Sequence, residues 1–122
     1  MKKIFFLLTI LISSNVFAEW VFIGGTDDGS SMFIDKDTIL KESHKVKLWK
    51  KINYGKTEIE VLSTRSYEEF DCKKRTKIVL SVSGFTEFNF EGKMITSFNP
   101  PPKIDYIAPG SMDELMYNYV CK

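Results

Sequence analysis

The sequence predicts an α+β domain, mainly an antiparallel β-sheet of about six strands, with a C-terminal helix tied to the sheet by one disulfide. Short apolar, β-prone segments recur along the chain, and turns rich in glycine or proline separate them, which predicts the sheet. A capping box at Ser111 and Glu114, followed by an apolar stripe at helical spacing, predicts the helix.

Residues 1–18 have the layout of a secretory signal peptide. Two lysines precede an apolar run, and polar and small residues follow it up to Ala18. The apolar run is about half as long as a membrane-spanning helix. We therefore expect cleavage after Ala18 and a soluble, single-domain mature chain over residues 19–122, located in the periplasm or the medium and without a transmembrane segment. Glu19 stands where a lipoprotein would carry cysteine.

Cysteine content and charge restrict the class of protein further. An exported chain with two cysteines favours a disulfide between Cys72 and Cys121, with two buried thiols as the alternative. In the chain-entropy model, a closed loop of roughly 50 residues contributes at most about 4 kcal/mol. Loss of the two signal lysines lowers the formal net charge of +1 by two, so no charge imbalance points to nucleic acid.

Two short apolar runs predict the first strands. Residues 20–23 are β-prone and stop at a glycine pair, and residues 26–30 have the composition of a turn. Residues 32–34 form the second run, which ends at the polar residues 35–37.

The next strand has an alternating pattern. Residues 45–48 alternate charged and apolar side chains, and Ile52 continues the face of Val46 and Leu48. One face of this strand is therefore expected in the core and the other in water. Trp49 has the opposite parity, so it lies outside the core face or marks a bulge.

The later strands are less regular. Residues 57–70 do not keep one period, which predicts a bulge or break near residues 63–66. Residues 76–90 form the longest β-prone stretch, and we expect the Ser-Gly pair within it to kink the strand. A Glu-Gly pair predicts a hairpin turn into residues 93–98, and three prolines then end the sheet.

The closing segment predicts a helix from about Met112 to Val120. Ser111 can accept from the third helical N–H, and Glu114 can reach back to the serine N–H. The apolar stripe expected to face the core consists of Leu115, Met116, Tyr119 and Val120.

Asp35 and Asp37 raise the alternative of an enzyme. They follow an apolar run and resemble the aspartate pair of haloacid-dehalogenase-type phosphatases, in which the first attacks phosphorus, the second handles the proton and Mg²⁺ offsets charge. That chemistry needs a doubly wound parallel sheet. The hairpins expected after Asp37 leave no room for crossover helices, which favours two turn or cap residues.

No other group of residues predicts catalysis or metal binding. The acids at 27, 28, 35 and 37 lack the spacing of a calcium loop, and the single histidine, His44, lies in a polar stretch without a nucleophile elbow. We expect no catalytic residues, no metal and no cofactor.

Two basic clusters are candidates for ligand binding. One lies on the strand that begins at residue 45, and the other directly follows Cys72. On neighbouring strands they would form a positive face for an acidic polysaccharide or an acidic protein patch. The alternative is a solvated face that protects sheet edges. The candidate residues are Lys45, Lys47, Lys50, Lys73, Lys74 and Arg75.

Several short motifs occur in a fixed order over nearly the whole mature chain. They are Trp20, Phe33-Ile34-Asp35, Val46-Lys47-Leu48-Trp49, Glu69-Phe70-Asp71-Cys72, Pro109-Gly110-Ser111 and Cys121. In this order the chain resembles the surface-adhesin protein E family. The resemblance implies an antiparallel sheet with a disulfide-tied C-terminal helix, in an exposed bacterial protein. Some relatives bind host extracellular-matrix or serum proteins.

These observations together predict an exported, non-enzymatic, adhesin-like binding module. Its expected partner is a host extracellular protein, an envelope protein or an acidic polysaccharide. The alternatives are a periplasmic Mg²⁺-dependent phosphatase-type hydrolase using Asp35 and Asp37, and a structural or inhibitory subunit of an envelope complex.

Intact-mass spectrometry of the protein from native envelope and medium fractions checks the processing. We expect a mass that begins at Glu19 and rises by two hydrogens on reduction, because cleavage after Ala18 and one disulfide are predicted. A mass that retains residues 1–18, or that does not change on reduction, would contradict this expectation.

Overall fold

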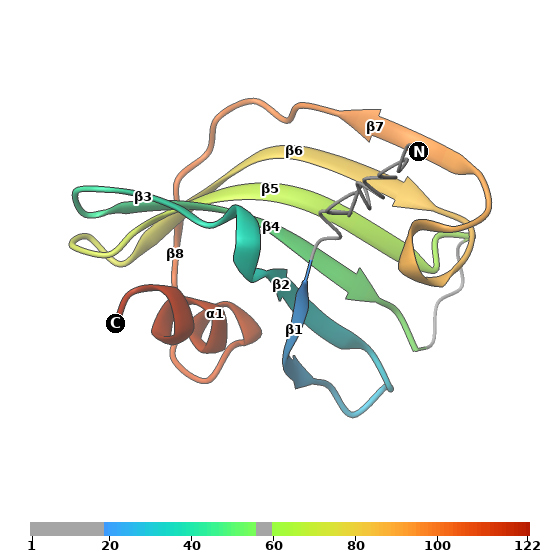
Figure 1. Cartoon of the computed structure of the whole chain (residues 1–122), viewed down its shortest axis with the longest axis horizontal. Coiled ribbons are helices and arrows are strands. Elements are labelled where there is room, and N and C mark those ends of the chain that lie inside the picture. The colour runs from blue at the N-terminus through green and yellow to red at the C-terminus, as the bar shows by residue number, and fades with distance from the viewer. Residues whose placement is uncertain (1–18, 56–59) are drawn as a thin grey trace, which may run out of the picture.

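The computed structural model describes residues 19–55 and 60–122. Within them, eight strands form one antiparallel sheet, and a single α-helix packs against it (Figure 1). The elements are β1 (Trp20–Gly25), β2 (Ser31–Asp35), the 3-10 helix η1 (Lys36–Thr38), β3 (Leu40–Glu42), β4 (Lys45–Asn53), β5 (Ser63–Asp71), β6 (Thr76–Phe85), the 3-10 helix η2 (Phe88–Phe90), β7 (Met94–Phe98), β8 (Asp105–Tyr106) and α1 (Met112–Val120).

The strand order is β1-β2-β4-β5-β6-β7, with β3 pairing with β4 and β8 pairing with β6. The long strands β4, β5 and β6 therefore form the centre of the sheet. Cys72 follows β5 and Cys121 follows α1, and the two form a disulfide with their Cα atoms 5.4 Å apart. The predicted fold class and the predicted disulfide between the helix and the sheet are both confirmed.

The parity of β4 defines the two faces of the sheet. Successive side chains of a strand point to opposite faces. Val46 and Leu48 are buried against α1, and Trp49 and Lys51 point the other way, among aromatic rings. We call the face that carries Val46 and Leu48 the helix face, because α1, the only α-helix in the described residues, covers it. We call the face that carries Trp49 and Lys51 the open face. Trp49 thus lies outside the core face.

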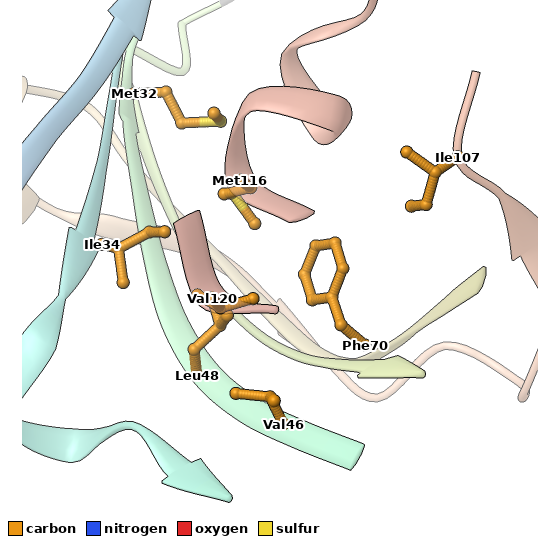
Figure 2. Packing of buried hydrophobic residues seen from close by; sticks show 8 residues of the cluster. All are labelled: Met32, Ile34, Val46, Leu48, Phe70, Ile107, Met116 and Val120. Carbon is orange, nitrogen blue, oxygen red and sulfur yellow. The ribbon is translucent and has the colours of Figure 1, made fainter. Parts of the chain in front are cut away.

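The hydrophobic core lies between α1 and the helix face (Figure 2). Met116 and Val120, four residues apart on α1, point at the sheet. Leu115 was predicted for the core but is 46% exposed. Helix positions 116 and 120 form a narrow i, i+4 stripe, and Leu115 lies at its margin. The buried core residues are Met32, Ile34, Val46, Leu48, Phe70, Ile107, Met116 and Val120.

The start of α1 has the predicted N-cap with one difference. The Ser111 side chain accepts from the Glu114 N–H at 3.2 Å, as the capping box requires. The Glu114 carboxylate accepts from the Gly110 N–H at 3.0 Å instead of the Ser111 N–H. The Ser111 N–H donates to the Ala108 carbonyl in the preceding turn, so it is not free for Glu114.

Two expectations for the middle of the chain are wrong, namely the bulge or break near residues 63–66 and the strand that runs to residue 90. β5 runs without a break from Ser63, and the β5–β6 ladder shifts register only between Tyr67 and Glu68. β6 ends at Phe85 rather than residue 90. Its pairing with β7 shifts register between Gly84 and Phe85, next to the Ser-Gly pair that was expected to disturb the strand. The chain then forms η2 over the open face. Residues 57–59 of the predicted strand, and the signal peptide at 1–18, lie outside the described residues.

A buried carboxylate joins the sheet to the helix. Glu68 is 1% exposed on the helix face, and its carboxylate contacts Lys50 Nζ at 2.6 Å and Lys77 Nζ at 3.1 Å. Lys77 Nζ also lies 2.9 Å from the Asp113 carboxylate on α1. Burial opposes ionisation of Glu68, but the two ammonium groups and the Ser66 hydroxyl outweigh it and lower its pKa to about 2. The group is therefore charged at neutral pH.

Replacing Glu68 tests this network. We expect Glu68→Gln to lower the free energy of unfolding by about 3 kcal/mol at pH 7, because the buried Lys50 loses its carboxylate and Lys77 keeps only Asp113. The folded-state pKa lies below the ordinary value of 4.5, so the stabilisation is complete above pH 4.5 and is lost as the pH falls toward about 2. Urea unfolding should therefore show a smaller difference between wild type and variant at pH 3 than at pH 7.

The neighbouring Glu69 provides the matched control. Its carboxylate is on the open face, 3.9 Å from Lys45 Nζ and from Lys47 Nζ. We expect Glu69→Gln to change stability by less than about 1 kcal/mol, as for a partly exposed pair. Equal losses in the two variants, or a pH-independent Glu68→Gln loss, would show that the buried network does not act as described.

Candidate ligand-binding site

The six basic residues predicted to bind a ligand do not share one face. Lys50 is 9% exposed on the helix face and is engaged by Glu68, so its assignment to an exposed basic face is wrong. It has the parity of Val46 and Leu48, which places it toward α1. Arg75 lies 4.9 Å over the Tyr117 ring and is paired with Glu114.

The other four basic residues lie toward the end of the sheet where β4 begins and β5 ends. Lys45 and Lys47 point to the open face, and both are near the Glu69 carboxylate. Lys73 and Lys74 are exposed in the turn between β5 and β6. A ligand-binding role for these four residues stays a prediction.

Asp35 is the last residue of β2 and the N-cap of η1, and Asp37 lies in the first turn of η1. Asp35 caps this helix: its carboxylate accepts from the Asp37 N–H at 3.1 Å and from the Thr38 hydroxyl at 3.0 Å. The surrounding sheet is antiparallel, unlike the doubly wound parallel sheet that the phosphatase comparison requires. Across residues 19–55 and 60–122, no three His, Cys, Asp or Glu side chains form a group suited to a metal ion.

His44 lies in the exposed turn between β3 and β4. Its Nε2 is 3.5 Å from the Asp71 carboxylate. The backbone N–H groups of Lys74 and Lys73 donate to the same carboxylate and lower the pKa of Asp71. His44 therefore contributes to a contact between two hairpin turns.

Aromatic rings cover much of the open face. Trp49 and Tyr67 are directly opposite on β4 and β5, with ring centroids 4.7 Å apart. The ring centroid of Phe90 lies 5.5 Å from that of Trp20 and 5.3 Å from that of Phe85. These separations are typical of favourable aromatic pairs.

Two cations lie among these rings. Lys51 is 7% exposed, and its Nζ is 4.4 Å from the centre of Phe33 and 5.1 Å from that of Trp20. It donates to Asn89 Oδ1 at 2.9 Å, and burial lowers its pKa. The Arg65 guanidinium lies 5.3 to 5.7 Å from three ring centres, namely Trp49, Phe85 and Phe90.

The short helix η2 holds Phe90 over the open face in a strained conformation. Asn89 and Phe90 have φ values of 55° and 66°, in the left-handed region that side chains other than glycine rarely adopt. The Asn89 N–H donates to Asn53 at 3.0 Å, and the Phe90 N–H donates to the Ser63 hydroxyl at 3.1 Å. Strain of this kind persists where the surroundings enforce it, often at ligand sites.

A hollow of about 430 Å³ opens between these groups. Its volume lies within the range of roughly 300 to 1,000 Å³ that is usual for small-molecule sites. Both tryptophans of the chain line it. We call this cavity the tryptophan hollow. Its lining residues are Trp20, Asp35, Thr38, Trp49, Arg65 and Phe90.

Sequence reasoning missed the tryptophan hollow for identifiable reasons. Arg65 lies within the expected break of β5, and Phe90 lies within a stretch that was expected to continue as a strand. The sequence pattern therefore assigned neither side chain to a face of the sheet. A usable signal existed on β4, because Trp49 and Lys51 share a parity opposite to the core residues Val46 and Leu48.

Comparison with known proteins gives a family match. The model of the surface-adhesin protein E family matches residues 20–122. No curated protein sequence matches the chain. Among the described residues, no helix has both the length and the apolar character needed to span a membrane.

Solved structures of Haemophilus influenzae protein E share the fold. The protein from a non-typeable strain superposes with a TM-score of 0.65 at 14% identity, over 88% of this chain and 78% of that one. A second structure gives 0.60 at 14% identity, over 88% and 86%. Crystal form II gives 0.57 at 16% identity, over 74% and 79%. At these identities the likeness concerns the fold alone.

Proposed function

The chain belongs to the surface-adhesin protein E family, and we propose that it is an exported, non-enzymatic binding module that holds an anionic macromolecule on the open face of its sheet. On the helix face, α1 covers the buried core residues Val46, Leu48 and Phe70. The open face instead presents aromatic rings, cations and the tryptophan hollow.

The contrast between the cations of the two faces is the observation that carries this proposal. On the helix face, Lys50 and Lys77 both contact the Glu68 carboxylate, and Lys77 also contacts Asp113, so two carboxylates balance the two ammonium groups. On the open face, Lys51 and Arg65 have no carboxylate within 4 Å among the described residues. Buried or half-buried charges are normally paired. An anionic ligand in the tryptophan hollow would supply a partner for Arg65, which lines it.

The exposed lysines at one end of the sheet support the proposal electrostatically. Lys45 and Lys47 lie on the open face, and Lys73 and Lys74 extend from the adjacent turn. Their positive field would raise the rate at which an anionic chain or an acidic protein patch reaches this face.

Binding by charge variants tests the proposal. We expect Arg65→Gln to weaken binding to immobilised heparin and to purified matrix proteins at least tenfold, because one charge-assisted contact is lost. Surface plasmon resonance at 0.1 and 0.3 M salt would measure this loss, with thermal unfolding to verify the fold. Lys103→Gln, which removes one charge at an exposed site beside Asp105, is the control and should change the affinity less than twofold. Equal effects of the two variants would refute a specific open-face site.

A further inference from the structure

We propose that the tryptophan hollow is a subsite for one carboxylated sugar residue of an acidic glycan, which rests on the proposed function and names the chemistry of its ligand. The hollow combines flat aromatic walls, a single guanidinium and a single carboxylate. A uronic acid ring has the complementary groups: C–H faces, one carboxylate and several hydroxyls.

The tryptophans supply the walls. Trp20 reaches the hollow from β1 and Trp49 from β4, and both side chains are half-buried. An indole presents a large, rigid apolar face. The C–H groups on one side of a pyranose ring can pack on such a face, while the sugar hydroxyls stay at the rim in contact with polar groups or water.

Arg65 supplies the anion-binding group. Three rings surround its guanidinium and fix its plane, and its N–H groups have no hydrogen-bond partner among the described side chains. The planar fork of a guanidinium matches the two oxygens of a carboxylate. Asp35 lines the same hollow without pairing with Arg65, so the guanidinium is left for a ligand.

Asp35 and Thr38 favour a ligand with one negative charge and many hydroxyls. The Asp35 carboxylate accepts two hydrogen bonds within η1, and a carboxylate has about four acceptor positions. The remaining positions can accept from sugar hydroxyls. The same negative charge repels sugars that carry an additional sulfate or phosphate, so the hollow favours a simple uronic acid over a densely charged unit.

Phe90 forms a further wall of the tryptophan hollow, and contacts within the protein fix its position without a ligand. Phe90 is held in its left-handed conformation by hydrogen bonds from η2 to Asn53 and Ser63. A preformed wall lowers the entropy lost on binding. For a ligand of monosaccharide size with a single ionic contact, we expect a dissociation constant on the order of 1 mM.

Tryptophan fluorescence reads this site directly, because both tryptophans of the chain line the hollow. We would titrate the exported protein, at constant ionic strength, with glucuronate, with glucose, and with glucuronate 2-sulfate, which carries one additional negative charge. We expect a saturable change with glucuronate and at least tenfold weaker responses to the other two sugars. Arg65→Gln should remove the preference for glucuronate over glucose, and Lys103→Gln should preserve it. Thermal unfolding of each variant verifies the fold.

Three results would overturn the inference. They are equal responses to glucuronate and glucose, a stronger response to glucuronate 2-sulfate than to glucuronate, and an unchanged glucuronate preference in Arg65→Gln. If no sugar alters the fluorescence but heparin or matrix proteins still bind in an Arg65-dependent way, the carboxylated-sugar subsite is wrong and the proposed function stands. If Arg65→Gln binds those macromolecules as wild type does, the proposed function itself fails.

Discussion

A helix of nine residues is the only α-helix in the described part of the chain, and the sheet that it covers has eight strands. One short helix can bury only one face of such a sheet. Met116 and Val120 form a compact core there with Leu48 and Phe70. The side chains on the other face must therefore limit their own contact with water, and aromatic rings packed beside cations do this without a second layer.

The lysine and arginine side chains consequently have different partners on the two faces. Between α1 and the sheet, water is excluded, and Lys50 and Lys77 are tolerated because Glu68 lies between them. On the open face, rings take the place of the carboxylate around Lys51 and Arg65. Ring quadrupoles attract a cation without cancelling its charge. The open face thus keeps a net attraction for anions that the helix face has lost.

Features encoded locally could be predicted from the sequence, and features that depend on pairing between strands could not. The alternation of Val46 and Leu48 and the Ser111 cap are local, and the structure contains both. Lys50 was grouped with its neighbours in sequence, although its parity places it on the core face. Phe90 lies over the open face because Asn53 and Ser63, distant in sequence, hold η2 there. No periodicity of residues 76–90 encodes that contact.

The disulfide has a consequence for how the protein responds to proteases. Cys72 and Cys121 are 49 residues apart, and β6, β7, β8 and α1 all lie between them. The connection between β7 and β8 is largely exposed, and exposed segments of this kind are preferred sites of proteolytic nicking. A single cut there would open the covalent loop without releasing a fragment. The two pieces would remain joined through the disulfide. Trp20, Trp49 and Arg65 would all lie on the N-terminal piece.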